Sequence, residues 1–125
     1  QLAHADEVRD SLRASHWQLD LYDLLDAIGK GYSVLEMIWE TSAGAWSVER
    51  LEYRDPRWFK FDTQQIGDQP ATGRRLLLRS DEHPMGQPLQ PYTFLCHIPR
   101  LKTGLPIRQG LARAAAFSYM AKNYG

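Results

Sequence analysis

The 125-residue sequence contains little cysteine, no long apolar segment and no net charge. Cys96 is its single cysteine, which excludes an internal disulfide framework and a cysteine-rich zinc site. No apolar run approaches the ~18–20 residues that cross a bilayer, so we expect no membrane-spanning segment. A composition of 43% hydrophobic and 24% charged residues argues against disorder and collagen. We therefore expect one domain over residues 1–125 and, because the chain begins with Gln1, a fragment of a longer protein.

Although the fifteen basic and fifteen acidic residues cancel, they are unevenly placed. Residues 1–28 carry a net charge of −4, residues 29–70 of −2 and residues 71–125 of +6. An acidic beginning and a basic end suit head-to-tail contacts between subunits, or a basic surface near phosphate. Ion pairing within one small fold is the ordinary alternative.

The first segment is predicted to be helical over residues 1–29. An apolar stripe follows helical spacing, and three aspartates decorate the other side: Trp17, Leu21, Leu24, Leu25 and Ile28 against Asp20, Asp23 and Asp26. Gly29 and Gly31 are expected to end this helix. Val8 and Leu12 indicate a weaker turn or two of helix upstream, with Ser15 as a break and N-cap.

Residues 30–98 are predicted to be rich in strands. Residues 32–39 are apolar on both faces, which is typical of a central strand. A hairpin loop at 41–44 leads to a return strand whose apolar phase switches, predicting a bulge near Glu49 and Arg50. A turn at Asp55-Pro56-Arg57 precedes a third strand containing Trp58, Phe59 and Phe61. Residues 76–78 and 92–98 give two more strands, separated by irregular connections at 62–75 and 80–91.

The last segment, residues 105–124, is predicted to form one helix that is apolar nearly all round, and therefore buried or at an interface. Arg108 and Lys122 would then lie only ~40° apart around it. The sequence therefore predicts an α+β fold with an N-terminal helix, one mostly antiparallel sheet of about five strands and a C-terminal helix.

Few residues combine into a chemical site. Cys96 and His97 are neighbours on a predicted strand and point to opposite faces, so Cys96 is expected to be a buried, inert thiol. His97 lies on the more polar face. The other histidines lack metal-ligand spacing, and the aspartate row is expected to be a solvated face. Glu36 and Glu40 share a strand face, which leaves a small hydrolase as the lowest-ranked hypothesis.

The stretch from Lys102 to Gly110 is a basic, glycine-containing loop that opens a helix, where backbone amides attract phosphate. It matches neither a P-loop nor a dinucleotide fingerprint, and a loop that simply fixes the turn is the ordinary alternative. With Arg100 and Lys102, Arg108 and Lys122 would form one basic patch. That patch suits either a DNA backbone or an acidic neighbouring subunit.

Three ordered blocks carry a resemblance to a known family: LLDAIGKGYSVLEMIWE at Leu24–Glu40, RDPRWFKF at Arg54–Phe61 and HIPRLKTGLPIRQGLARAAAFSYMAKN at His97–Asn123. The sequence resembles the portal proteins of Mu-like phages and prophages over about residues 18–125. The resemblance implies a ring-shaped homo-oligomer at one capsid vertex. Such a ring passes double-stranded DNA, docks the terminase and joins head to tail, without catalysis and without a cofactor.

By this resemblance the chain is a wing-like portion of a portal subunit. It is expected in the virion, or in the host cytoplasm during assembly. The candidate subunit or DNA contacts are Arg57, Trp58, His97, Arg100, Lys102, Arg108, Gly110 and Lys122. A nucleic-acid-binding module that uses the basic C-terminal third remains the alternative function.

Overall fold

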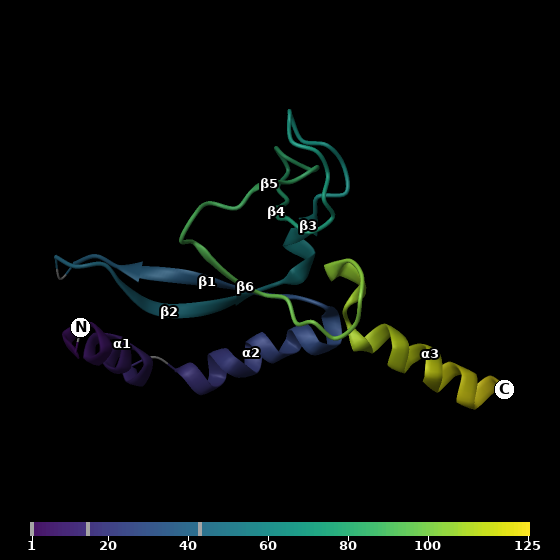
Figure 1. Ribbon diagram of the computed structural model, residues 1–125, viewed down its shortest axis with the longest axis horizontal. Coiled ribbons are helices and arrows are strands. Elements are labelled where there is room, and N and C mark those ends of the chain that lie inside the picture. Colours follow the sequence, from purple (N-terminus) through teal and green to yellow (C-terminus); the bar gives the residue numbers. More distant parts are fainter. Residues whose placement is uncertain (1, 15, 43) are drawn as a thin grey trace.

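The computed structural model describes residues 2–14, 16–42 and 44–125 (Figure 1). In this part the chain forms three α-helices, six strands and two short 3-10 helices. In order these are α1 (Leu2–Ala14), α2 (Trp17–Lys30), β1 (Ser33–Glu40), β2 (Ser47–Arg54), η1 (Pro56–Trp58), β3 (Phe59–Phe61), β4 (Leu76–Leu78), β5 (Gln87–Pro88), β6 (Phe94–His97), η2 (Pro106–Arg108) and α3 (Leu111–Tyr124).

The first sheet has the order β2–β1–β6, with both pairs antiparallel. Strand β1 lies between the other two, which confirms the prediction of a central strand made from its two apolar faces. The bulge is also confirmed: Ile38 pairs with Arg50 and Trp39 with Val48, which leaves Glu49 as the extra residue. The connection at 41–46 includes Ala43, which lies outside the described residues.

The remaining strands form a second antiparallel sheet, in the order β3–β4–β5. The α+β class is confirmed, but one sheet of about five strands is wrong, because the described chain has two sheets of three strands. The turn after β2 ends one sheet and starts the other, and Trp58 belongs to this turn rather than to a strand. Residues 80–91, predicted to be irregular, contain the short strand β5.

The core joins the two sheets. Its buried side chains come from β1, β3 and β4 and from the residue before β1: Tyr32, Val34, Phe59, Phe61 and Leu76. Two pairs of aromatic rings pack edge to face across it, with centroids 5.2 Å apart for Tyr32 and Phe61 and 5.6 Å apart for Phe59 and Phe94. This shared core packs the two sheets against each other.

Helix α2 begins and ends near the predicted positions. Its N-cap is His16, and the predicted cap, Ser15, lies outside the described residues. Gly31 ends the helix in the left-handed conformation with φ 100°, and its N–H donates to Ala27 O at 2.7 Å. Gly29 remains inside the helix. Upstream, α1 has thirteen residues, more than the one or two turns expected.

The face that α2 buries is not its apolar stripe. Asp20 and Ala27 are buried, whereas Trp17, Leu21, Leu25 and Ile28 are 38–54% exposed. The prediction that Asp20 is solvated is therefore wrong, and burial together with Asp23 raises the pKa of its carboxyl. As a result, α2 offers a row of large apolar side chains to solvent.

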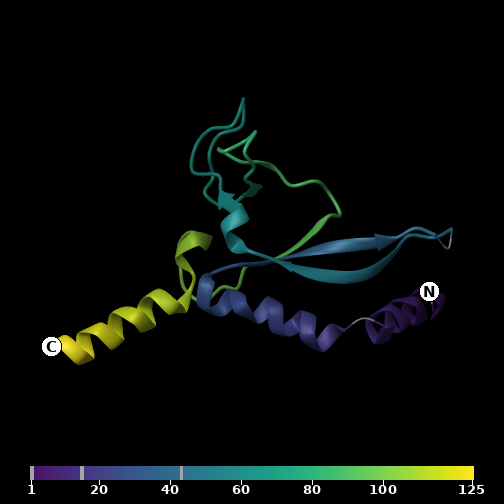
Figure 2. The ribbon, with the colours of Figure 1, turned by 180° about the vertical axis from the view of Figure 1, so that it is seen from behind.

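The C-terminal segment is not one helix. Residues 106–108 form the 3-10 turn η2, Gly110 is extended with ψ 135°, and only then does α3 begin. Because Arg108 lies before this break, its predicted proximity to Lys122 around one helix is wrong. Figure 1 shows α3 running away from the sheets to the end of the molecule opposite α1, and Figure 2 shows the same from behind.

Candidate functional site

The three blocks that carry the family resemblance meet at the end of α2. From the last block, His97 Nδ1 donates to Leu24 O at 2.9 Å, which fixes the proton on Nδ1. Gly110 packs so closely on the chain around Gly31 that an added Cβ would lie 2.4 Å from Gly29 O. We call this region, residues 24–33 with 54–58, 97 and 110, the motif junction.

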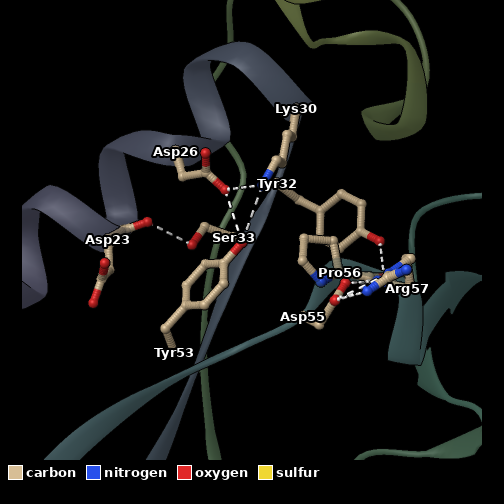
Figure 3. A network of polar contacts seen from close by, with 9 residues as sticks. All are labelled: Asp23, Asp26, Lys30, Tyr32, Ser33, Tyr53, Asp55, Pro56 and Arg57. Atoms are coloured by element: carbon tan, nitrogen blue, oxygen red, sulfur yellow. Dashed lines mark hydrogen bonds and ion pairs between the residues drawn. The ribbon is translucent and has the colours of Figure 1, made fainter.

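The middle block supplies a capped turn to the motif junction. Asp55 accepts from Arg57 N at 2.9 Å, and its other carboxylate oxygen accepts from the Arg57 guanidinium at 2.7 Å. These bonds lower the pKa of Asp55 to about 2. Tyr32 OH donates to Pro56 O at 2.7 Å and ties the turn to the residues after α2 (Figure 3). Of the predicted contacts, Arg57 is therefore paired within the chain, although its side chain is 88% exposed.

A polar cluster links α2 to β2 (Figure 3). Asp26 Oδ2 lies 2.8 Å from Lys30 Nζ and accepts from Tyr53 OH at 2.9 Å. Lys30 Nζ also donates to Tyr53 OH at 3.2 Å, and these bonds, the one to Asp26 first, raise the pKa of the lysine. Beside it Ser33 Oγ donates to Asp23 O at 2.8 Å. The cluster fixes the angle between the helix and the hairpin.

Trp58 is about half exposed and lies beside the sheet rather than in it. The Arg54 guanidinium stands 5.8 Å from its ring centroid. The same guanidinium binds Glu36 at 2.6 Å and Glu52 at 2.8 Å, so it separates two carboxylates that face each other across β1 and β2. Glu40 instead accepts from Ser42 N at 2.7 Å. Glu36 and Glu40 thus have separate partners within the chain.

The predicted basic patch is only partly assembled. Arg100 and Lys102 line one hollow, Arg108 lies in η2 and Lys122 in the last turn of α3. All four side chains are exposed. Within the described residues none of them makes an ion pair.

Sequence reasoning missed two buried polar residues that shape the loops. Asp62, fully buried, accepts from Thr72 N at 3.0 Å and from Arg75 N at 2.9 Å. Burial opposes ionisation, but these bonds and the Arg75 guanidinium outweigh it and hold the pKa of Asp62 well below its usual range. Gln109 is 5% exposed and accepts from the backbone N–H groups of Leu101 and Lys102. Nothing in the local sequence distinguishes either residue from its polar neighbours.

Cys96 is exposed on the edge strand β6, so the prediction that its thiol is buried is wrong. An edge strand has a neighbour on one side only, and the apolar alternation of residues 92–98 does not reveal this. Across residues 2–14, 16–42 and 44–125, no three His, Cys, Asp or Glu residues gather as metal ligands would.

The helices at the two ends expose their apolar side chains. In α3 every residue is exposed, with Phe117 at 76% and Met120 at 58%. The described side chains of α1 are likewise all exposed, including Val8 at 60%. None of the helices in the part of the chain described is long and apolar enough to cross a membrane.

Comparison with known proteins agrees with the three blocks. The sequence profile of the family described as "Portal protein of Mu bacteriophage" matches residues 1–125. This chain belongs to that family. It is 32% identical over 123 residues to "Mu-like prophage FluMu protein gp29" of Haemophilus influenzae, and 31% identical over 121 residues to "Portal protein" of Escherichia phage Mu.

Each alignment covers 96% of this chain but 22% of the relative, so the chain spans about a fifth of the length of these curated relatives. The three blocks that carry the resemblance to this family meet in the motif junction. The described side chains of the terminal helices α1 and α3, and the cations Arg100, Lys102, Arg108 and Lys122, are exposed.

Proposed function

We propose that this chain is a wing-like structural part of a phage portal subunit and that it packs against other copies in a ring. Such a ring stands at one capsid vertex, lets double-stranded DNA pass, and meets the terminase and other head and tail proteins. The subunits assemble in the host cytoplasm and end in the virion. The role is structural, and no residue is assigned to catalysis or to a cofactor.

The observation that carries this proposal is the exposure of α3. A fourteen-residue helix is marginal by itself in water, and most helical stability comes from packing. Yet α3 exposes Phe117, Tyr119 and Met120 by more than half of their surface. A helix of this kind needs a covering surface, and large exposed apolar patches mark protein interfaces.

The charge distribution favours contact between α3 of one copy and the acidic N-terminal helices of another. Helix α3 has Arg113 and Lys122 and no acidic residue, while residues 1–28 carry a net charge of −4. Two copies of α3 side by side would place like charges together. Helix α1, within the acidic residues 1–28, lies at the end of the molecule opposite α3, as both ribbon views show. Contact between unlike ends is heterologous, and it closes into a ring when the rotation permits.

Electron microscopy of the full-length protein tests the proposal. We expect rings with a central hole from the unmodified protein. Met120→Asp should shift the population to single subunits, whereas Met85→Asp, a similarly exposed methionine near the second sheet, should leave the rings intact. Single subunits of the unmodified protein at every concentration would contradict the proposal.

A further inference from the structure

A basic hollow lies between two loops at the side of the second sheet. Its volume is about 520 Å³, within the usual range of ligand sites. Three cationic residues line it, Arg74 from the loop before β4 and Arg100 and Lys102 from the loop after β6. Thr103 adds a hydroxyl, and no carboxylate lines the hollow. The hollow therefore offers hydrogen-bond donors and positive charge from both sides.

The three cations have no counter-charge within the described chain. Earlier in the sequence Arg9, Lys30, Arg50, Arg54 and Arg57 all have carboxylate partners. From residue 71 onward Arg75 alone has one among the residues described, although eight cations occur there. The sequence has no acidic residue after Glu82. Long cationic side chains grouped without partners repel one another, so an anion would relieve that repulsion.

Both loops are held in place by the two buried polar residues. Gln109 Oε1 accepts from Lys102 N at 2.9 Å, and its Nε2 donates to Gly104 O at 3.3 Å. In the other loop, Asp62 accepts hydrogen bonds from Thr72 N and Arg75 N, the residues that flank Gly73 and Arg74. The loops also touch, since a Cβ added at Gly73 would lie 3.1 Å from the Leu105 side chain. The cations therefore project from rigid backbone, which reduces the entropy lost on binding.

We propose that this hollow binds phosphate groups, through Arg74, Arg100 and Lys102. Guanidinium groups bind phosphate oxygens in a bidentate way, and lysine adds a point charge. The phosphate belongs either to a nucleic-acid backbone or to a free phosphate ion, since both present the same oxygens. This proposal goes beyond the role in ring assembly, and either one can fail without the other.

Binding to the full-length protein at low salt tests the site with two probes, inorganic phosphate by calorimetry and short duplex DNA by fluorescence anisotropy. Arg74→Gln, Arg100→Gln and Lys102→Gln should each weaken binding roughly tenfold, as expected for one lost charge-assisted bond. For the duplex, each should also reduce the salt slope by about one unit. Binding of both probes identifies a phosphodiester site, and binding of phosphate alone identifies a site for the free ion.

Arg79→Gln is the matched control, because it removes an exposed cation that lies outside the hollow and has no carboxylate partner within the described residues. It should bind both probes as the unmodified protein does. The proposal is overturned if neither probe binds at low salt, or if the control weakens binding as much as the three hollow variants. Unchanged rings in the microscope for all four variants would show that phosphate binding and ring assembly are separate properties.

Discussion

The motif junction and the terminal helix α3 differ in how their residues are used. At the motif junction Gly110, Tyr32 and His97 each contact a backbone segment distant in sequence. In α3 all fourteen residues face solvent. A substitution at the motif junction should therefore lower the stability of the fold. A substitution in α3 should leave the fold unchanged and affect only what α3 meets.

Gly110→Ala should have the largest effect on stability. Its Cβ would lie 2.4 Å from Gly29 O and 2.7 Å from Lys30 C, and backbone cannot move aside as a side chain can. We expect the free energy of unfolding to fall by about 3 kcal/mol, as for a severe overpacking substitution. Urea unfolding measures the change.

Gly29→Ala is the control for Gly110→Ala. No atom lies within 4 Å of its added Cβ, and the residue is inside α2. We expect a gain of roughly 0.5–1 kcal/mol from helix propensity. Equal losses in the free energy of unfolding for both variants would show that Gly110 does not pack closely on the chain around Gly29.

Asp62→Asn should destabilise the loop at 62–75 in a pH-dependent way. The folded pKa of Asp62 is lowered, so its stabilisation is complete above the unfolded pKa of about 3.9 and is lost as the pH falls toward the folded value. Thermal unfolding should show a lower Tm for the variant at pH 7 and a shrinking difference below about pH 4.

Asp68→Asn is the control in the same loop, since Asp68 is exposed. It should have little effect at any pH. A constant difference between the Asp62 variant and the unmodified protein from pH 7 to pH 2 would mean that the charge of Asp62 has no part in holding the loop.

Tyr32→Phe should have a smaller effect. The substitution removes one hydroxyl that donates to Pro56 O from a side chain only 7% exposed. The expected loss is about 1 kcal/mol, the usual net value of a hydrogen bond. Tyr22→Phe, at a tyrosine that is 77% exposed on α2, should change nothing measurable by the same urea titration.

Phe117→Ala should have the smallest effect on unfolding, within about 0.5 kcal/mol, because the ring is 76% exposed. The same variant should reduce self-association of the full-length protein, which sedimentation velocity measures. A large loss of stability with unchanged association would reverse the roles assigned to α3 and to the motif junction.

Local patterns in the sequence predicted much of the fold. Three predictions depend only on neighbouring residues, and all three are confirmed. They are the glycine at the end of α2, the central place of β1 and the bulge at Glu49. The predictions that failed depend on distant residues. The break before α3 arises because Gly110 meets Gly29–Gly31, eighty residues earlier, and the exposure of Cys96 arises because β6 is an edge strand.

The role of the eight candidate residues as subunit or DNA contacts stays a prediction. Four of them, Arg57, Trp58, His97 and Gly110, lie in the motif junction, where their described contacts are within the chain. Arg100 and Lys102 line a common hollow, whereas Arg108 and Lys122 are separated by the helix break. The burial of Asp62 and Gln109 could not be predicted, because the local sequence does not show whether a polar side chain is buried.

Hydrogen–deuterium exchange of the full-length protein, measured in its rings and in its dissociated subunits, tests the central distinction most directly. The amides of residues 111–124 should exchange quickly in the single subunit and become protected in the ring, while those around Gly31 and Tyr32 should be protected in both states. Residues 111–124 that exchange equally in ring and subunit would contradict the account.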